Sequence, residues 1–377
     1  MEATATISSS SLLSQYADYL HILVCPHTRS DLRALTVGER DEINVEISQG
    51  LRFHFEGSPA SQPLEDGLIS ADGTYVYRIQ EGVIIVLKNL ALVKQDNVAD
   101  EDAGGLMSDK KSVQDFYNQF GWKQNDEGNF VDGDAYEDLR PVSQDYMYDC
   151  NVRIKRYLKP QGDYLLDAAS GPIQFDEYLE QSKQYRYRVC VDLSFLALQE
   201  ARKKLGERGI YLVTDMTDLP LKDNVMDGVV SINTLYHIPK DEQINAFKEM
   251  YRVMKAGSSG ILIYSWGRRS HLNNFLVLPQ KIWRKAKTFF QRASNYKGYD
   301  PDLLYFHAHP RSYFTKERLG FEPELSVWRL ISVPVQKWWI HGALAGKAIL
   351  RGIYRLEDRK PEWCGKVGEY PMFVFKK

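Results

Sequence analysis

The chain has 377 residues, a formal net charge of −2, 26% charged residues and 44% hydrophobic residues, which is ordinary for a globular protein of two or three domains. This balance gives no global reason to expect a nucleic-acid partner, and four scattered cysteines without a C-x-x-C pair argue against a disulfide framework or a structural zinc site. No apolar run approaches the roughly 20 residues that cross a bilayer, and the N-terminus lacks the pattern of a secretory signal. We therefore expect a cytoplasmic protein, or one bound peripherally to a membrane.

The charges are unevenly distributed along the chain. Residues 1–110 contain 8 Lys and Arg against 17 Asp and Glu, whereas residues 261–377 contain 21 against 9. A basic C-terminal part is most often solvated surface, but the asymmetry makes this part a candidate for contact with an anionic partner.

Short β-type runs come first along the chain. LRFHFEG, GTYVYRI and GVIIVL are separated by turn residues and predict a small β-rich domain over residues 1–95. The acidic, glycine-bearing residues 96–111 are typical of a linker. Residues 112–377 then form a second, larger domain.

Strands and helices alternate between Tyr164 and Trp266. The runs YLLDA, YRVCVD, YLVTD, MDGVVSI and GILIYSW predict five strands. We expect helices over FDEYLEQ, over FLALQEARKKL with Ser194 as N-cap and Gly206 or Gly209 as its end, and over DEQINAFKEMYRVMKAG with Gly257 as its stop. This alternation predicts an α/β fold with a parallel sheet covered on both faces, and ligands bind such sheets at the carboxyl ends of the strands.

Three aspartates, Asp167, Asp192 and Asp215, fall at three successive strand ends. A single aspartate there is usually an N-cap or a loop residue, but three in register predict a cofactor site. The loop after Asp167 has Ala169 and Ile173 where a dinucleotide enzyme needs glycine for close approach of a pyrophosphate. Gly171-Pro172 supplies one permissive turn, which suits a cofactor without phosphate.

The motifs LLDAASGP, VCVDLS, TDMTDLPLKDNVMDGVVS and RVMKAGSSGILI resemble class I S-adenosylmethionine-dependent methyltransferases of the type 11 kind, over roughly Ser112–Lys377. The resemblance implies a Rossmann-like sheet of seven strands. We expect YPMFVFKK to be its edge strand, paired with the FEPELSVWRL run.

The resemblance also implies a cofactor, S-adenosyl-L-methionine, and residues that bind it. Asp167, Ala169, Gly171 and Ile173 align with the acid and the glycines of the family loop. Asp192, followed by Leu193, aligns with the ribose-binding acid. The adenine would be held by Asp215 and Met216, the methionine moiety would lie beside Asn233, and Tyr117 in FYNQFGW would close over the cofactor.

The front of the chain resembles the small tRNA-methyltransferase-activator-like domain, through LVCPHTRSDLRAL and GLISADGTYVYRIQEGVIIVL. Only Cys25 remains of the paired zinc cysteines, and Thr28 takes its partner's position, so we expect no metal. His27 is more simply a turn residue than a ligand. Residues 37–67 look like an insertion, and the domain is expected to dock on the larger one or to complete a dimer surface.

Methyl transfer from a sulfonium is an in-line displacement that needs alignment and, for an oxygen or nitrogen acceptor, a base. Tyr236 and His237 in NTLYHIP follow the fourth strand and are our first catalytic candidates, although His237 equally suits a turn cap. His307 and His309 in YFHAHP are further candidates on a segment expected to cover the site, and their spacing also suits a strand face. No acidic or cysteine cluster accompanies them as metal ligands.

Two segments, about 268–312 and 330–365, are predicted lid insertions. Residues 268–298 carry eight basic residues and no acidic one, and the second segment mixes aromatic with basic residues. They are either solvated lid helices or a surface for an anionic or lipid-linked substrate or a membrane. Nucleic acid is not expected, because no RNA-binding module accompanies them.

The leading hypothesis is a methyltransferase acting on a small-molecule, glycan or lipid-linked acceptor. The alternative is a non-catalytic, methyltransferase-like binding or scaffold protein, because loop glycines and zinc cysteines are missing. An NAD-dependent oxidoreductase is disfavoured by the same missing glycines and by Asp215.

Overall fold

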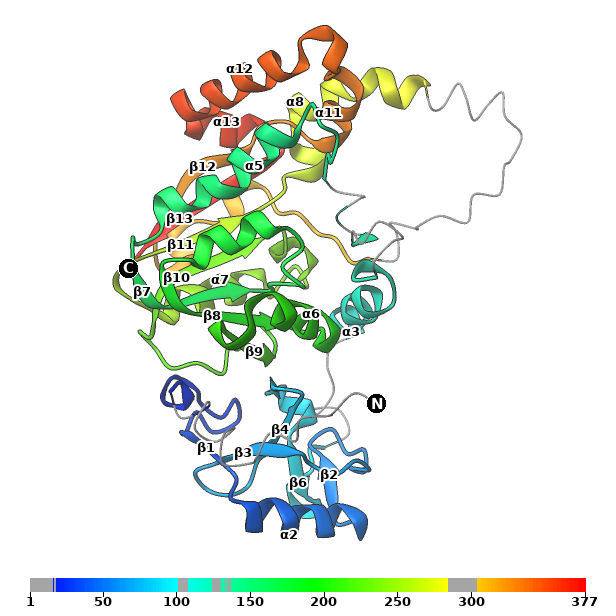
Figure 1. The fold of residues 1–377 in the computed structure, drawn as a ribbon, viewed down its shortest axis with the longest axis vertical. Helices are drawn as coiled ribbons and strands as arrows, with labels where there is room; N and C mark the ends of the chain where they lie inside the picture. The colour runs from blue at the N-terminus through cyan, green and yellow to red at the C-terminus, as the bar shows by residue number, and fades with distance from the viewer. Residues whose placement is uncertain are drawn as a thin grey trace, which may run out of the picture.

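One mixed sheet organises the chain, with helices on its faces (Figure 1). The computed structural model describes residue 16 and residues 18–100, 108–123, 130–131, 133, 137–283 and 304–377. The larger part has the strand order β9-β8-β7-β10-β11-β13-β12. These strands are β7 (Gly162–Ala168), β8 (Tyr185–Asp192), β9 (Gly209–Val213), β10 (Met226–Ile232), β11 (Met254–Ile263), β12 (Glu324–Arg329) and β13 (Tyr370–Lys376).

The first five of these strands are parallel, and the order reverses between β7 and β10, which is the switch point of a Rossmann-like sheet. The predicted seven-stranded α/β fold is thereby confirmed. β13 pairs antiparallel with β12, as predicted, but also with β11, so β12 and not β13 is the end strand. Phe373 and Phe375 are buried on β13, and burial of such side chains favours an interior position.

Two of the predicted helices differ from expectation and one agrees. α6 (Phe195–Leu205) begins after Ser194, whose side chain accepts the amide of Ala197 at 3.1 Å, and ends at Gly206. α7 (Gln243–Arg252) ends before Gly257, because Val253 and Met254 are fully buried and Met254 starts β11. FDEYLEQ forms the 3₁₀-helix η6 (Asp176–Ser182) instead of an α-helix. Arg188 binds the Tyr178 carbonyl at 2.6 Å, which an α-helix would use for the amide of Ser182.

The front strands extend the same sheet. β5 (Val83–Ile85) pairs parallel with β9, so the small β-rich part docks edge to edge on the larger one. LRFHFEG, GTYVYRI and GVIIVL contain β2, β4 and β5, and α2 and β2 lie in the residues predicted as an insertion. The remaining elements here are β1 (Leu32–Ala34), α2 (Val37–Ser48), β2 (Arg52–His54), β3 (Asp66–Ser70), β4 (Val76–Gln80) and β6 (Leu92–Lys94).

Further helices pack around the sheet, and α3 (Ser108–Phe116), α8 (His271–Leu276) and the start of α11 (Val333–Trp339) lie at the carboxyl ends of the parallel strands. α3 begins within the residues predicted as a linker and continues as a π-helical turn, η4 (Tyr117–Gly121). The predicted lid segments contain helices in their described parts. The remaining helices are α5 (Gln144–Arg153), α10 (Lys316–Leu319), α12 (Gly346–Arg359) and α13 (Pro361–Val367). None of the helices in the described ranges is long and apolar enough to span a bilayer.

Candidate functional site

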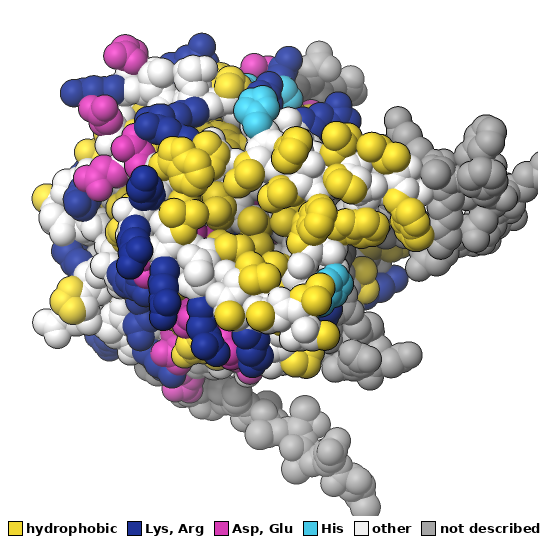
Figure 2. All heavy atoms as spheres, turned by 90° about the horizontal axis from the view of Figure 1, so that it is seen from above, with side chains coloured by type: hydrophobic (Ala, Val, Ile, Leu, Met, Phe, Trp, Pro, Cys, Tyr) yellow, Lys and Arg dark blue, Asp and Glu magenta, His cyan; other side chains and the backbone are white. Residues whose placement is uncertain are grey.

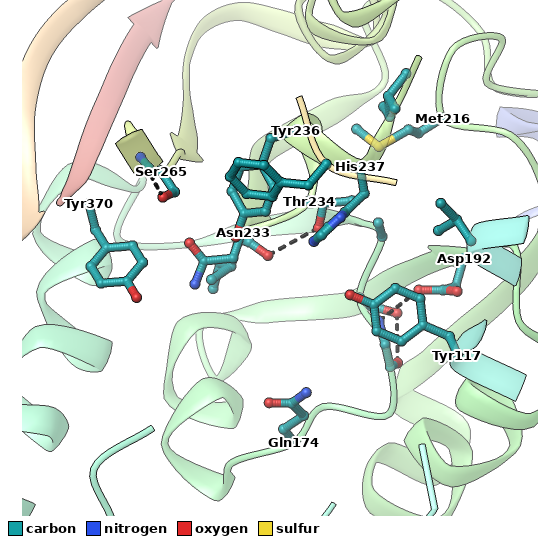
Figure 3. Close-up of a pocket in the computed structure, with 18 of the residues that line it drawn as sticks. Tyr117, Gln174, Asp192, Met216, Asn233, Thr234, Tyr236, His237, Ser265 and Tyr370 are labelled. Atoms are coloured by element: carbon teal, nitrogen blue, oxygen red, sulfur yellow. Dashed lines mark hydrogen bonds between the residues drawn. The ribbon is translucent and has the colours of Figure 1, made fainter. Parts of the chain in front are cut away.

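A cavity of about 630 Å³ opens at the carboxyl ends of β7, β8, β9 and β10. α3 and η4 form one wall, and the opposite wall comes from residues after β11, from α8, and from the start of α11. Figure 3 shows Tyr117 of η4 on one side of the cavity and Ser265 and Tyr370 on the other. The volume lies in the range of cavities that enclose a whole small molecule. The cavity therefore occupies the position where sheets of this topology bind ligands.

The loop after β7 adopts a glycine-type backbone at three positions. Ala169, Gly171 and Ile173 have φ angles of 59°, 54° and 54°. We expected Gly171 alone to supply the permissive turn, and that expectation is wrong. A non-glycine residue with such a φ angle costs roughly 1–2 kcal/mol. Ile173 is fully buried, and burying such a side chain contributes about 1.5–3 kcal/mol, which offsets the strain.

Asp167, the predicted acid of this loop, is buried and paired inside the fold. Its Oδ2 accepts hydrogen bonds from the Nε and Nη2 of Arg188 at 2.9 and 2.5 Å. Both residues line the cavity. Asp167 thus contributes to the cavity wall as half of an ion pair, and Arg188 is a wall residue that the sequence pattern did not single out.

Asp192 at the end of β8 connects two backbone segments of the cavity. Its carboxylate accepts the amide of Gly171 at 2.9 Å and the amide of Ser194 at 2.8 Å. Burial raises the pKa of Asp192 to about 6, although these two amides act in the opposite direction. Leu193 follows in the cavity wall. Asp192 is therefore a positioned carboxylate facing the cavity, in the place predicted for a ribose-binding acid.

Asp215 and Met216 line the cavity after β9, and Asp215 is already engaged. Lys110 of α3 lies with its Nζ 2.5 Å from Asp215 Oδ2 and also pairs with Glu242. Burial lowers the pKa of Lys110, but the two carboxylates together outweigh burial and raise it. Lys110 lies in the predicted linker, where no motif indicated a role in the site.

Asn233 follows β10 at the centre of the cavity (Figure 3). Its φ of 58° is one that asparagine tolerates better than most residues. In the described residues its Oδ1 is buried and has no hydrogen-bond partner. A buried amide oxygen without a partner costs free energy unless a ligand donor meets it, so Asn233 is a candidate ligand contact.

Aromatic rings close the cavity on the side of η4. Tyr117 stacks on Trp122 with ring centroids 4.7 Å apart, and its ring meets that of His237 edge to face at 6.1 Å. A Cβ added at Gly171 would lie 2.9 Å from the Trp122 ring, so a side chain there would collide with it. Trp122 therefore contacts both residues: Tyr117, which lies at the cavity as predicted, stacks on its ring, and residue 171 must be glycine to leave room for it.

His237 is the best-defined candidate base. Its Nδ1 lies 2.8 Å from the backbone oxygen of Tyr305, which can only accept, so the neutral ring carries its proton on Nδ1 and Nε2 is the acceptor. Burial lowers the pKa of His237 to about 4, so the ring is neutral at physiological pH. Tyr236 lines the same cavity, with its ring 4.8 Å from that of Phe306.

His307 and His309 do not line the cavity, in contrast to Phe306 on the same segment. The Nε2 of His309 lies 2.9 Å from the Lys240 carbonyl, and its ring stacks on Tyr313 at 3.4 Å. Alternating side chains in this extended segment put the neighbouring Phe306 toward the cavity and the two histidines elsewhere.

The far end of the cavity was not predicted from the sequence. Glu369, just before β13, accepts the Ser265 hydroxyl at 2.8 Å, and burial raises its pKa although this hydrogen bond opposes the effect. The sequence signal for these residues is only their position after β11 and before β13. Other residues at this end are Gly267, Arg268, Asn273, Val277, Gln280, Lys281, Ser332, Pro334 and Tyr370.

The front part uses its candidate metal ligands for internal contacts. Cys25 Sγ lies 3.2 Å from the Tyr77 hydroxyl. The ring of His27 stacks on Tyr75 at 4.1 Å, and its Nε2 lies 3.1 Å from the Lys88 carbonyl. In the ranges that the structure describes, no three His, Cys, Asp or Glu residues converge as metal ligands.

Comparison with known proteins identifies the central part of the chain. Residues 166–262 match the family model of the methyltransferase domain Methyltransf_11. The probable tRNA methyltransferase 9B of Bos taurus is 28% identical over 160 residues, which is 41% of this chain and 33% of that protein. An uncharacterized protein of Methanocaldococcus jannaschii is 24% identical over 49% of this chain and 71% of its own length. The chain therefore spans about a third of the length of the curated tRNA-methyltransferase relatives it matches.

Among solved structures, geranyl diphosphate C-methyltransferase from Streptomyces coelicolor is similar with a TM-score of 0.42 and 13% identity, over 72% of this chain and 99% of that one. The complex of the Haloferax volcanii Trm112 methyltransferase activator with its methyltransferase contains a chain with a TM-score of 0.38 and 16% identity. That match covers 62% of this chain and 90% of the other.

Proposed function

We propose that the whole chain transfers a methyl group from S-adenosylmethionine to an oxygen or nitrogen of an amphiphilic small molecule. The match of residues 166–262 to a methyltransferase domain supports the methyl-transfer part of this proposal. The observation that carries this proposal is one cavity that contains a positioned carboxylate, an unsatisfied amide oxygen and a neutral histidine. These residues are Asp192, Asn233 and His237.

The residues at the strand ends fit the cofactor chemically. The carboxylate of Asp192 is oriented by two backbone amides and retains lone pairs for ribose hydroxyls. The Oδ1 of Asn233 would accept from the ammonium group of the methionine moiety. When bound, S-adenosylmethionine supplies a methyl group on a sulfonium, which is already activated for displacement. The remaining work of the chain is to align the acceptor and to take its proton.

His237 would take that proton. Its Nδ1–H is held by the Tyr305 carbonyl, so Nε2 carries the lone pair, and the low pKa keeps it unprotonated. A base with so low a pKa suits an acceptor whose proton becomes acidic as the new bond forms. The aromatic rings of Tyr236 and Phe306 line the cavity beside it.

The far end of the cavity supports an amphiphilic acceptor. Val277 and Pro334 contribute apolar surface, whereas Arg268 and Lys281 contribute cations. In the described part of the chain neither cation has a carboxylate partner within 4.0 Å, as the ion pairs there involve other residues. An acceptor with an apolar chain and an anionic group, such as a lipid-linked compound, would satisfy both features.

Calorimetric titration with S-adenosylmethionine tests the cofactor half of the proposal. Asp192→Asn should weaken binding roughly 10–100-fold, because hydrogen bonds to charged groups are worth about 1.5–3 kcal/mol. Asp163→Asn is the matched control, since Asp163 is an exposed carboxylate near the opposite end of β7. Absence of binding by the unaltered protein would favour the alternative of a non-catalytic, methyltransferase-like binding protein.

An acceptor screen tests the other half by following release of S-adenosylhomocysteine. The panel should contain lipid-linked and free anionic alcohols and amines, and also bulk tRNA. tRNA is the second candidate acceptor, because curated relatives that share part of this chain are named as tRNA methyltransferases. Turnover with tRNA and with no small molecule would contradict the acceptor class proposed here.

A further inference from the structure

We propose that the face formed by α8, residues 278–283, α11 and η12 (Gly342–Leu344) binds the surface of an anionic membrane and presents the cavity to a lipid-linked acceptor. We name it the lid face. The second clause rests on the proposed function, whereas membrane binding itself does not.

The lid face exposes large apolar side chains that the described fold leaves uncovered. Phe275 is 72% exposed, Leu344 66% and Ile282 60%. Leu278, Trp283 and Trp339 are also about half exposed. Figure 2 shows apolar side chains gathered over this side of the molecule, with basic side chains along their margin. Contiguous exposed apolar surface of this kind marks an interaction site.

Contacts between the elements make the lid face one surface. The indole Nε1 of Trp339 on α11 donates to the Leu276 carbonyl of α8 at 2.8 Å. The rings of Trp283 and Trp338 lie 6.1 Å apart. Because α8 and α11 are thus joined, their exposed apolar side chains would meet a partner together.

The charges of these segments all have one sign. Residues 268–283 and 333–344, which contain the lid face, have four Lys and Arg and no Asp or Glu. Lys281 and Lys337 of the lid face are exposed and form no ion pair with any residue that the structure describes. Lys347 and Arg351 of α12 differ, because they line a groove together with Asp145 and Asp149, and Lys347 pairs with Asp145 at 3.3 Å. Unpaired cations around apolar surface complement anionic lipid headgroups.

The lid face is continuous with the cavity. Val277, Gln280 and Lys281 line the cavity, while Phe275 and Ile282 of the same short stretch point to solvent. A membrane that received the exposed side chains would therefore lie next to the cavity end that carries Arg268 and Lys281.

A bilayer fits this face better than RNA or a protein does. Exposed aliphatic side chains such as Leu278, Ile282 and Leu344 gain free energy in the acyl region but have no counterpart on an RNA backbone. Tryptophans such as Trp283 and Trp339 are preferred at the membrane–water boundary. A protein partner would need carboxylates placed opposite Lys281 and Lys337, whereas an anionic bilayer carries negative charge over its whole surface.

Sedimentation with vesicles tests the inference on the full chain. We expect at least about tenfold more protein bound to phosphatidylcholine vesicles containing phosphatidylglycerol than to phosphatidylcholine alone, since each cation near such a surface is worth about 1 kcal/mol. The double variants F275S/I282S and K281E/K337E should each lose most of this binding. The matched controls are V45S/L51S, which replaces two apolar residues of the front part that are about half exposed, and Lys248→Glu on α7.

Circular dichroism melting shows whether each variant folds, and calorimetry with S-adenosylmethionine is run on the same samples. Equal binding to both vesicle types, or no binding, would overturn the inference while leaving the cofactor result unaffected.

If light scattering shows a dimer, and both double variants are monomeric, the lid face would bind a second copy of the chain instead. Retention by bulk tRNA without vesicle binding would likewise overturn it. Vesicle binding without cofactor binding would support the lid face and contradict the proposed function.

Discussion

The Nδ1 of His237 lies 2.8 Å from the backbone oxygen of Tyr305, and this contact fixes which nitrogen of the ring is available as a base. The contact joins the 3₁₀ turn after β10 to a segment 68 residues later in the chain. The base is therefore assembled by the fold and not by a local motif.

Replacing His237 by Gln should lower methyl transfer by roughly 10²–10⁴-fold while leaving cofactor affinity nearly unchanged, because a general base acts on the acceptor. Steady-state rates and calorimetry measure the two effects. Since the pKa of His237 is about 4, the rate at saturating cofactor should not fall on the acid side until the pH is well below 6, whereas protonation of Asp192, whose pKa is about 6, should weaken cofactor binding. A rate at saturating cofactor that declines near pH 6.5 would contradict the assignment of His237.

The same pKa shift predicts a change of stability with pH. Unfolded His237 has a pKa near 6.5, so between pH 6.5 and 4 the unfolded chain binds more protons and stability falls as pH falls. The loss should reach about 3 kcal/mol. Urea unfolding at several pH values should show it in the unaltered protein and much less in H237Q, with the exposed His341→Gln as control. The raised pKa of Asp192 acts with the opposite sign, which makes the comparison of variants necessary.

The ion pairs of Lys110 with Asp215 and Glu242 should hold α3 against the cavity. Lys110→Met leaves Asp215 and Glu242 without their shared cation, and we expect a loss of about 1–3 kcal/mol in unfolding free energy. Cofactor affinity should fall with it, because α3 leads into Tyr117. Lys111→Met, the exposed neighbour on the same helix, is the control. Equal losses of stability from Lys110→Met and Lys111→Met would show that the ion pairs of Lys110 do not stabilise the fold.

Glycine substitutions in the loop after β7 should have opposite effects at two positions. Ala169→Gly relieves roughly 1–2 kcal/mol of backbone strain and costs about 0.4–1 kcal/mol of unfolded-chain entropy, so stability should rise slightly. Ile173→Gly relieves the same strain but removes a fully buried side chain, and stability should fall by about 2–4 kcal/mol. Urea unfolding measures both. A loss at Ala169 would mean that its φ angle stores no strain.

Docking of the front part should contribute to the stability of the larger part. Val83 of β5 is fully buried in a cluster with Ile173, Cys190 and Leu198. Val83→Ala should therefore lower the unfolding free energy by about 1–3 kcal/mol. Val45→Ala, at a position 53% exposed on α2, should stay within about 0.5 kcal/mol. Similar values for both would show that the β5–β9 junction is not coupled to the core.

The sequence by itself determined the α/β class, the strands and the place of the cofactor residues. Apolar runs that end in Asp167, Asp192 and Asp215 are local patterns, and parallel strands necessarily bring their carboxyl ends to one edge. Ser194 as N-cap of α6 followed from the same local chemistry. Local patterns also placed β2, β4 and β5 at the front.

Only the tertiary structure decided what those residues contact. Arg188 pairs with Asp167, Lys110 with Asp215 and Tyr305 with His237, across separations of 21, 105 and 68 residues. In the structure β13 lies between β11 and β12, and α7 ends before Gly257. Three residues of the loop after β7 adopt positive φ angles, and His307 and His309 lie outside the cavity. Each outcome depends on burial against distant segments. Propensity and spacing describe neighbours along the chain and carry no information about such partners.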